Sequence, residues 1–140
     1  MAQVCVDANV VLSRLIPGQQ NERVESLWSQ WMRDHDTPFG PPLLYAEVPS
    51  VLRQAVFSGR LTPEEGDLAF DAFRDMNIAV SARGDLHVIA WELARTYKQS
   101  RVYDAMYLAA AHAEACELWT LDRRLINTVN LPWVRWAGNA

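Results

Sequence analysis

Four acidic residues in distinctive surroundings are the side chains of this chain best suited to chemistry. Asp7 and Asp122 each follow a short apolar run, and Glu47 and Asp104 lie inside apolar segments with helical spacing. An isolated carboxylate in such a setting is costly to desolvate and needs a partner. If the fold gathers the four, cations must offset their repulsion, and an all-oxygen ligand set selects hard ions such as Mg²⁺ or Mn²⁺. The pattern predicts a metal-dependent nuclease.

Each of these acids also has a structural explanation when it is considered alone. An Asp that follows a strand is often a turn former or a helix cap. An Asp in the first turn of a helix, as predicted for Asp104, is favoured there by the backbone N–H groups and the helix dipole. The residues therefore need further evidence before they are assigned to a site.

Length and composition are those of one globular domain, which we place at residues 1–140. A chain of this length buries ~70% of its unfolded surface. No apolar run approaches the ~18 residues of a membrane span, and the first residues lack the pattern of a secretory signal. Cys5 and Cys116 form no CxxC motif, so we expect free thiols and a cytoplasmic protein with no membrane association.

The net charge of −4 contrasts with the basic face that is usual for nucleic-acid proteins. Subtracting the four acids from the 17 Asp and Glu residues leaves 13, which equals the 13 Lys and Arg residues. The net charge of −4 thus equals the total charge of the four acids in the predicted metal site. The basic residues are nearly all Arg, with Lys98 the only lysine, and the Arg guanidinium suits bidentate contact with phosphate as well as ordinary surface ion pairs.

Strand-like and helix-like segments alternate along the chain. Strands are predicted at 4–6, 78–80, 118–121 and 133–136, and helices at 9–16, 21–36, 41–59, 62–76, 86–97 and 103–115. This alternation predicts an α/β fold with a mostly parallel sheet and helices on both faces. Ligands of such sheets bind outside the carboxyl ends of the strands, where Asp7 and Asp122 are expected.

The local sequences around the acids narrow the interpretation. The chain carries, in order, Val6-Asp7-Ala8-Asn9, Glu47 followed by Val48, Val51 and Leu52, the segment Tyr103–Ala111 beginning Tyr103-Asp104-Ala105, and Thr120-Leu121-Asp122-Arg123-Arg124-Leu125. With these motifs the chain resembles the PIN-domain family, and within it the VapC-type toxin ribonucleases. The resemblance extends from Val4 to about Trp136.

The resemblance implies a five-stranded parallel sheet and an acidic pocket that holds Mg²⁺ or Mn²⁺ and hydrolyses RNA phosphodiesters. Asp7, Glu47, Asp104 and Asp122 match the family's acidic positions, which are both catalytic and metal-binding. Asn9 and Thr120 match polar positions and are expected to orient the carboxylates by hydrogen bonds, although a helix cap and a strand residue are alternative explanations. The products would carry a 5′-phosphate and a 3′-hydroxyl.

Water is the expected nucleophile, because no His, Ser or Cys is placed to attack phosphorus. Arg123 and Arg124 directly follow Asp122, and at least one is predicted to contact an RNA phosphate. The expected partners are an RNA substrate, a cognate antitoxin protein and a second copy of the chain. A surplus of large apolar residues, including Trp28 and Trp31, adds to the expectation of a homodimer.

Two positions depart from the family pattern. Pro49 lies two residues after Glu47, so we expect a break near Glu47 and a helix that starts at Pro49. Ala115 stands where a helix-terminal glycine is common, which matters little if the turn avoids positive φ.

Other classes fit less well or remain open. A receiver domain needs an acidic pair after the first strand and a late lysine, and a haloacid-dehalogenase-type phosphatase needs an Asp where Asn9 stands. Both are disfavoured. A non-catalytic PIN scaffold that binds proteins and a housekeeping RNA-processing nuclease remain as alternatives to a toxin of a type II toxin-antitoxin pair.

Overall fold

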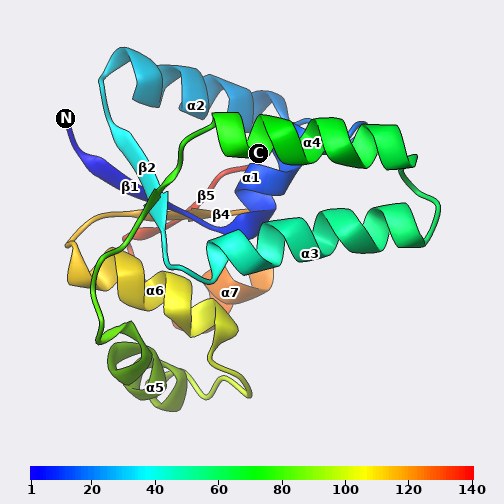
Figure 1. The fold of residues 1–140 in the computed structure, drawn as a ribbon. Coiled ribbons are helices and arrows are strands. Elements are labelled where there is room, and N and C mark those ends of the chain that lie inside the picture. The colour runs from blue at the N-terminus through cyan, green and yellow to red at the C-terminus, as the bar shows by residue number, and fades with distance from the viewer.

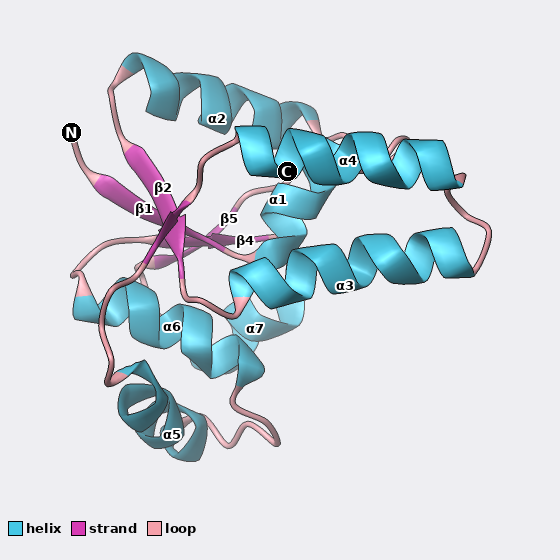
Figure 2. Cartoon of the chain, viewed as in Figure 1, coloured by secondary structure: helices cyan, strands magenta, loops and turns pink.

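A parallel five-stranded sheet forms the centre of the computed structural model, which describes residues 1–140 (Figures 1 and 2). The strands are β1 (Gln3–Val6), β2 (Thr37–Gly40), β3 (Ala79–Val80), β4 (Leu118–Thr120) and β5 (Val134–Trp136). They lie in the order β3-β2-β1-β4-β5, and every neighbouring pair is parallel. The predicted α/β fold with a parallel sheet is confirmed.

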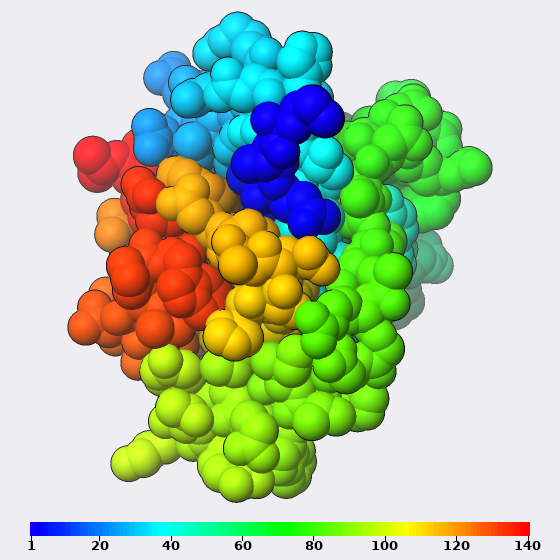
Figure 3. Space-filling model, turned by 90° about the vertical axis from the view of Figure 1, so that its left-hand side faces the viewer, coloured from blue at the N-terminus to red at the C-terminus, as the bar shows by residue number.

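Helices cover both faces of this sheet. They are α1 (Ala8–Leu15), α2 (Glu22–Arg33), α3 (Leu44–Phe57), α4 (Pro63–Asp75), α5 (Leu86–Thr96), α6 (Tyr103–Ala113) and α7 (Arg123–Val129). Figure 1 shows α1, α2 and α4 on one side, and α6 on the other with α5 outside it. In Figure 3, α5 and the loop after it project at one end of the molecule. None of the helices has the length and apolar character needed to cross a membrane.

Helix α6 packs on the sheet through small side chains. Ala105 and the run Tyr107–Ala111 are buried, and three of these five consecutive residues are alanines. Because alanine side chains are short, the helix axis lies close to the strands while its Tyr107 and Leu108 fill the remaining space. The small residues of this motif thereby bring the first turn of α6 to the edge of the sheet.

Two elements were not predicted from the sequence. Strand β2 contains Pro38 and Gly40, residue types that are depleted in strands. Pro38 is tolerated because the pairing with β3 begins only at Phe39, so its missing N–H costs no bond on that side. Helix α7 spans only seven residues, which is too short for a clear periodic pattern.

The predicted break near Glu47 is wrong. Helix α3 runs without interruption from Leu44 to Phe57 and contains Pro49 in its second turn. The Glu47 N–H donates to the Leu43 carbonyl at 2.9 Å, so the turn that carries the carboxylate is regular before the proline is reached. Pro49 thus removes one hydrogen bond near the start of the helix, where the loss is smaller than in its middle.

The end of α6 differs from the expectation as well. The helix stops at Ala113, and Ala115 adopts a left-handed backbone with φ 52°. The Ala115 N–H donates to the His112 carbonyl and the Cys116 N–H to the Ala111 carbonyl, each at 3.1 Å. This is the Schellman arrangement, whose left-handed position is usually glycine. Alanine at this position is therefore strained.

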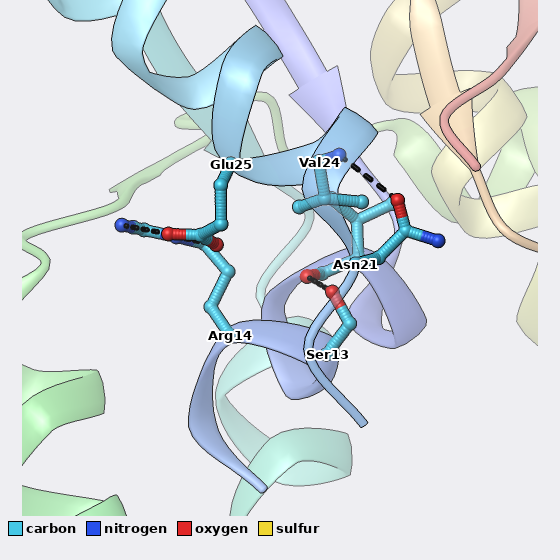
Figure 4. A network of polar contacts seen from close by, with 6 residues as sticks. Ser13, Arg14, Asn21, Val24 and Glu25 are labelled. Carbon is cyan, nitrogen blue, oxygen red and sulfur yellow. Dashed lines mark hydrogen bonds and ion pairs between the residues drawn. The ribbon is translucent and has the colours of Figure 1, made fainter. Parts of the chain in front are cut away.

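The connection from α1 to α2 is fixed by polar contacts (Figure 4). The Asn21 side chain accepts from the Val24 N–H and caps α2, and Arg14 pairs with Glu25 at 2.9 Å. The Arg14 guanidinium also lies over the Trp28 ring, 4.5 Å from its centroid.

The two tryptophans of α2 belong to the core. Trp28 and Trp31 are 6% and 5% exposed and meet edge to face with centroids 5.4 Å apart. Trp31 also contacts Trp119 of β4 in the same manner. These residues therefore pack within one chain, and they provide no apolar surface for a second copy.

Candidate active site

The candidate site lies where the strand order reverses. The chain leaves β1 toward β2 on one side, whereas β4 lies on the other side of β1. Asp7 follows β1, and Asp122 follows Thr120, the last residue of β4. Crevices at such a reversal, outside the carboxyl ends of the strands, are the usual ligand sites of open α/β sheets. The topology thus brings Asp7 and Asp122 to the same edge.

Asp7 is held firmly in this crevice. The residue is only 7% exposed, and each oxygen of its side chain accepts a hydrogen bond. Oδ1 accepts from the Ala8 N–H at 2.8 Å, which caps α1, and Oδ2 accepts from the Thr120 hydroxyl at 2.8 Å. The orientation of the carboxylate is therefore set by the first residue of α1 and the last residue of β4.

Thr120 and Asn9 connect the ends of β1 and β4. The Thr120 Oγ1 accepts from the Asp122 N–H at 3.0 Å, and the Asn9 Oδ1 accepts from the Leu121 N–H at 3.0 Å. The Asn9 amide lies 3.4 Å from Thr120 Oγ1 and 3.5 Å from Asp7 Oδ2. Both polar residues contact Asp7, and the cap of α1 is Asp7 rather than Asn9.

The other three acids stand at the starts of three further helices. Glu47 and Asp104 lie in the first turns of α3 and α6, and the Asp122 Oδ1 accepts from the Leu125 N–H at 3.2 Å and caps α7. Figure 1 shows the beginnings of α3, α6 and α7 converging beside α1. Helix N-termini favour negative charge, so this convergence lowers the cost of gathering carboxylates. The side chain of Asp104 caps no helix.

Burial and mutual repulsion raise the pKa values of three of the acids. The pKa of Asp7 rises to about 7, mainly because the group is buried. The hydrogen bond from Thr120 opposes this rise, and the charges of Asp104 and Glu47 add to it. Burial and the charge of Asp104 raise the pKa of Glu47, and burial and the charge of Asp122 raise that of Asp104. A cation among these groups would relieve the repulsion.

Tyr107 contributes a hydroxyl to the same crevice. The residue is 1% exposed, and its hydroxyl oxygen is buried without a hydrogen-bond partner. The hydroxyl is near enough to Glu47 to lower the pKa of that carboxyl, but no protein atom completes a hydrogen bond of standard geometry with it. Buried polar groups are nearly always satisfied, so this hydroxyl is available to a ligand or water in the crevice.

The donor set fits a hard divalent ion held partly by water. All the groups are oxygens, and no three His, Cys, Asp or Glu side chains approach closely enough to enclose an ion by themselves. Mg²⁺ usually keeps several waters and takes only one or two carboxylates directly. Carboxylates too widely spaced to enclose a bare ion, with an unpartnered hydroxyl beside them, match that preference.

Two hollows meet at Asp104. One, of about 440 Å³, is lined by Leu43, Glu47, Gln99, Ser100, Arg101, Tyr103 and Asp104. The other, of about 360 Å³, is lined by Lys98, Gln99, Ser100, Asp104, Asp122, Arg124, Leu125 and Thr128. Asp7 lies beneath this surface rather than in either lining.

The two arginines after Asp122 differ in their surroundings. Arg124 lines the second hollow, and its charge opposes the rise in the pKa of Asp104. Arg123 lies over the Trp136 ring, 4.0 Å from its centroid.

Two tyrosines near the acids were not predicted as site residues from the sequence. Tyr103 and Tyr107 both lie in the Tyr103–Ala111 motif, and Tyr107 is three residues, close to one helical turn, after Asp104.

Comparisons with known proteins agree with this fold. The family model described as PIN domain matches residues 4–131. No curated protein sequence matches the chain significantly. Among solved structures, a chain of the crystal structure of VapBC2 from Rickettsia felis, bound to a DNA fragment from its promoter, is similar with a TM-score of 0.73 and 12% identity. The alignment covers 99% of each chain, and at this identity it shows the likeness of the folds alone.

Proposed function

Since the chain belongs to the PIN domain family, we propose that it is a Mg²⁺- or Mn²⁺-dependent endoribonuclease that acts as the toxin of a type II toxin-antitoxin pair. The observation that carries the proposal is the grouping of four acids at the starts of four helices: Glu47, Asp104 and Asp122 line two adjoining hollows, and Asp7 lies beneath them. Their charges act on one another, as the raised pKa values of Asp7, Glu47 and Asp104 indicate.

Asp7, Glu47, Asp104 and Asp122 are the residues that would hold the metal. When bound, Mg²⁺ or Mn²⁺ supplies positive charge that lowers the pKa of an attacking water and offsets the charge of the phosphate oxygens. Thr120 and the Ala8 N–H hold the Asp7 carboxylate in one orientation. Asn9 fixes Leu121 and thereby the start of the segment that carries Asp122.

The remaining residues bind the substrate and the nucleophile. Water attacks phosphorus in line with the 3′-oxygen, which leaves with a proton, so that one product carries a 5′-phosphate and the other a 3′-hydroxyl. The Tyr107 hydroxyl lies beside Glu47 and Asp7 and would hydrogen-bond a water there. Arg124, at the rim beside Asp104, contacts a phosphate of the RNA.

An antitoxin and a second copy of the chain are the proposed protein partners. The fold likeness to a chain of VapBC2 supports the first of these. The second rests on the resemblance to VapC-type toxins, because Trp28 and Trp31 are buried within the monomer. Light scattering at tens of micromolar should give the mass of a dimer, and a monomer at that concentration would exclude it.

The substitution Asp104→Asn tests the site, because it removes one charge with little change of shape. We expect it to abolish metal-dependent RNA cleavage and to leave the metal-free melting temperature equal or higher. Metal at about a hundred times its Kd should stabilise the wild type by ~2.7 kcal/mol and the variant clearly less. Asp71→Asn, on the exposed side of α4, is the matched control and should behave as the wild type.

The opposite pattern would show that Asp104 is structural. Loss of a carboxylate that only stabilises the first turn of α6 would lower stability by about 0.3–1 kcal/mol, and metal would then affect both proteins alike. Metal-dependent stabilisation without cleavage of any RNA would instead favour the non-catalytic scaffold. Efficient cleavage restricted to one precursor RNA, without growth arrest on expression, would favour a housekeeping nuclease.

A further inference from the structure

A further hollow lies at the amino ends of the strands, on the opposite edge of the sheet from the acids. It measures about 450 Å³ and lies between α2 and the beginnings of β1 and β4. In Figure 3, which shows this face, the N-terminal residues in dark blue lie between the end of α2 in cyan and the α6–β4 connection in orange. The hollow shares no lining residue with the two that meet at Asp104. Its volume is within the range of sites for small organic ligands.

Helix α2 forms one wall of this hollow. Its lining residues follow one another at the three- and four-residue spacing of a single helix side, and they are Arg23, Leu27, Gln30, Trp31 and Asp34. Leu27 and Trp31 are buried and give the wall an apolar part, whereas the other three are exposed at its rim. From the helical rise, Asp34 lies ~16 Å along the axis from Arg23. The hollow therefore has a cation at one end and an acid at the other.

Trp119 of β4 forms part of the opposite wall and carries an unsatisfied donor. The residue is 6% exposed, and its indole Nε1–H is buried without a hydrogen-bond partner. Its ring meets that of Trp31 edge to face, with centroids 6.1 Å apart. A buried indole N–H usually finds an acceptor. An acceptor oxygen that enters the hollow beside Trp119 would satisfy this group.

The charge around Trp119 is positive. The Arg23 and Arg135 guanidinium groups lie 5.9 Å and 5.0 Å from the centroid of its ring. Arg135 pairs with Glu117 at 2.6 Å, and Arg23 takes part in none of the ion pairs of the chain. Two guanidinium groups thus share one carboxylate. An unpaired guanidinium beside a free N–H donor is suited to a carboxylate or a phosphate oxygen.

The other two acids of the hollow do not oppose an anion at this end. Asp36 accepts from the Ala2 N–H at 2.9 Å and lies 3.7 Å from the terminal amine of Met1, so its charge is already matched. Asp34 lies at the far end of α2, beyond the screening length of about 8–10 Å that holds at physiological salt. The positive charge at Trp119 is therefore local to that end.

We infer that this hollow binds a small organic oxyanion, a carboxylate or a phosphate monoester on an apolar body. Its charged oxygen accepts from the Trp119 Nε1–H and from Arg23, and its apolar part lies against Leu27 and Trp31. The inference goes beyond the proposed function and does not depend on it, because no residue of the hollow belongs to the acidic site.

The test follows the indole N–H signals of the protein by two-dimensional ¹H–¹⁵N NMR. Each of the six tryptophans gives one such signal, and Trp119→Phe identifies that of Trp119 by its loss. The ligands tested are phenylacetate and phenyl phosphate, with uncharged phenylacetamide for comparison. At least one of the two anions should move the Trp119 signal downfield in a saturable manner, and the tighter one identifies the anionic group. Phenylacetamide should bind at least about tenfold more weakly than phenylacetate if the carboxylate is that group.

Arg23→Ala tests the contribution of the cation. It should weaken binding of the preferred anion at least about tenfold, because a charge-assisted hydrogen bond is lost. Arg23 is exposed, so we expect the fold to persist, and unchanged signals of the remaining tryptophans would verify this. Arg33→Ala, at the last residue of α2 and outside the hollow, is the matched control and should bind as the wild type.

The outcomes are independent of any nuclease activity. If neither anion moves the Trp119 signal, or if Arg23→Ala binds like Arg33→Ala, the site is wrong. An Nε1–H directed at the Trp31 ring would give that result, with an upfield signal that no ligand changes. RNA cleavage by the same protein would leave the nuclease standing in that case, and anion binding without cleavage would leave the site standing and overturn the nuclease.

Discussion

The Thr120 hydroxyl donates a hydrogen bond of 2.8 Å to Asp7 Oδ2, across 113 residues of sequence. The same oxygen of Thr120 accepts from the Asp122 N–H. A single buried side chain thus fixes one acid of the site by its side chain and a second by its backbone. The geometry of the crevice depends on this residue as much as on the acids.

Replacing Thr120 with Val should therefore weaken both the fold and the site. Valine has the same shape but leaves the Asp122 N–H without its acceptor and Asp7 Oδ2 with only the longer contact from Asn9, at a cost of about 1–3 kcal/mol in the free energy of unfolding. Thr120→Ser keeps the hydroxyl and should retain metal-induced stabilisation, with only the smaller loss of a methyl group. Chemical denaturation of the three proteins, with and without Mn²⁺, checks this, and equal behaviour of the two variants would contradict it.

The raised pKa of Asp7 makes the stability of the metal-free protein depend on pH. Because the pKa rises from 3.8 to about 7, the folded protein binds this proton more tightly than the unfolded chain does. The free energy of unfolding should then fall as pH increases from about 4 to 7, by up to about 1.4 kcal/mol per pH unit. Asp7→Asn should flatten this dependence in EDTA. The same slope in both proteins would show that other groups cause it.

Removing the Tyr107 hydroxyl should separate stability from metal binding. Tyr107→Phe deletes a buried group without a partner, so the metal-free protein should be equally stable or up to about 1 kcal/mol more stable. Stabilisation by Mg²⁺ or Mn²⁺ should decrease. The control is Tyr45→Phe, because the Tyr45 hydroxyl donates to the Ile78 carbonyl and its loss should destabilise the protein without affecting metal. Thermal melts of both variants would distinguish these cases.

The left-handed Ala115 predicts a stabilising substitution. Ala115→Gly relieves a backbone conformation that costs an alanine about 1–2 kcal/mol, against a smaller entropic cost of glycine in the unfolded chain. We expect a net gain of about 0.5–1 kcal/mol in the free energy of unfolding. The same change two residues earlier, Ala113→Gly at the last residue of α6, should lower stability by up to about 1 kcal/mol. Denaturant titration of the two variants checks the contrast in sign.

Much of the fold follows from local sequence. The apolar runs before Asp7 and Asp122 and the periodic apolar spacing of the long helices suffice to predict the alternation of strands and helices. The capping box Thr62–Glu65 marks the start of α4 by local chemistry alone. Strand β2 and the continuity of α3 through Pro49 were not predictable in this way, because neighbouring strands and the surrounding core outweigh the local preferences of Pro and Gly.

The sequence by itself determined which acids and polar residues this chain offers and that Asp7 and Asp122 follow strands. Only the tertiary structure decided that β1 and β4 are neighbours, which lets Thr120 reach Asp7. It also decided that Arg124 lines the same hollow as Asp104 while Arg123 lies over the Trp136 ring, and that the Tyr107 hydroxyl is left without a partner. Contacts between residues far apart in the chain depend on strand order and packing, which local preferences do not encode.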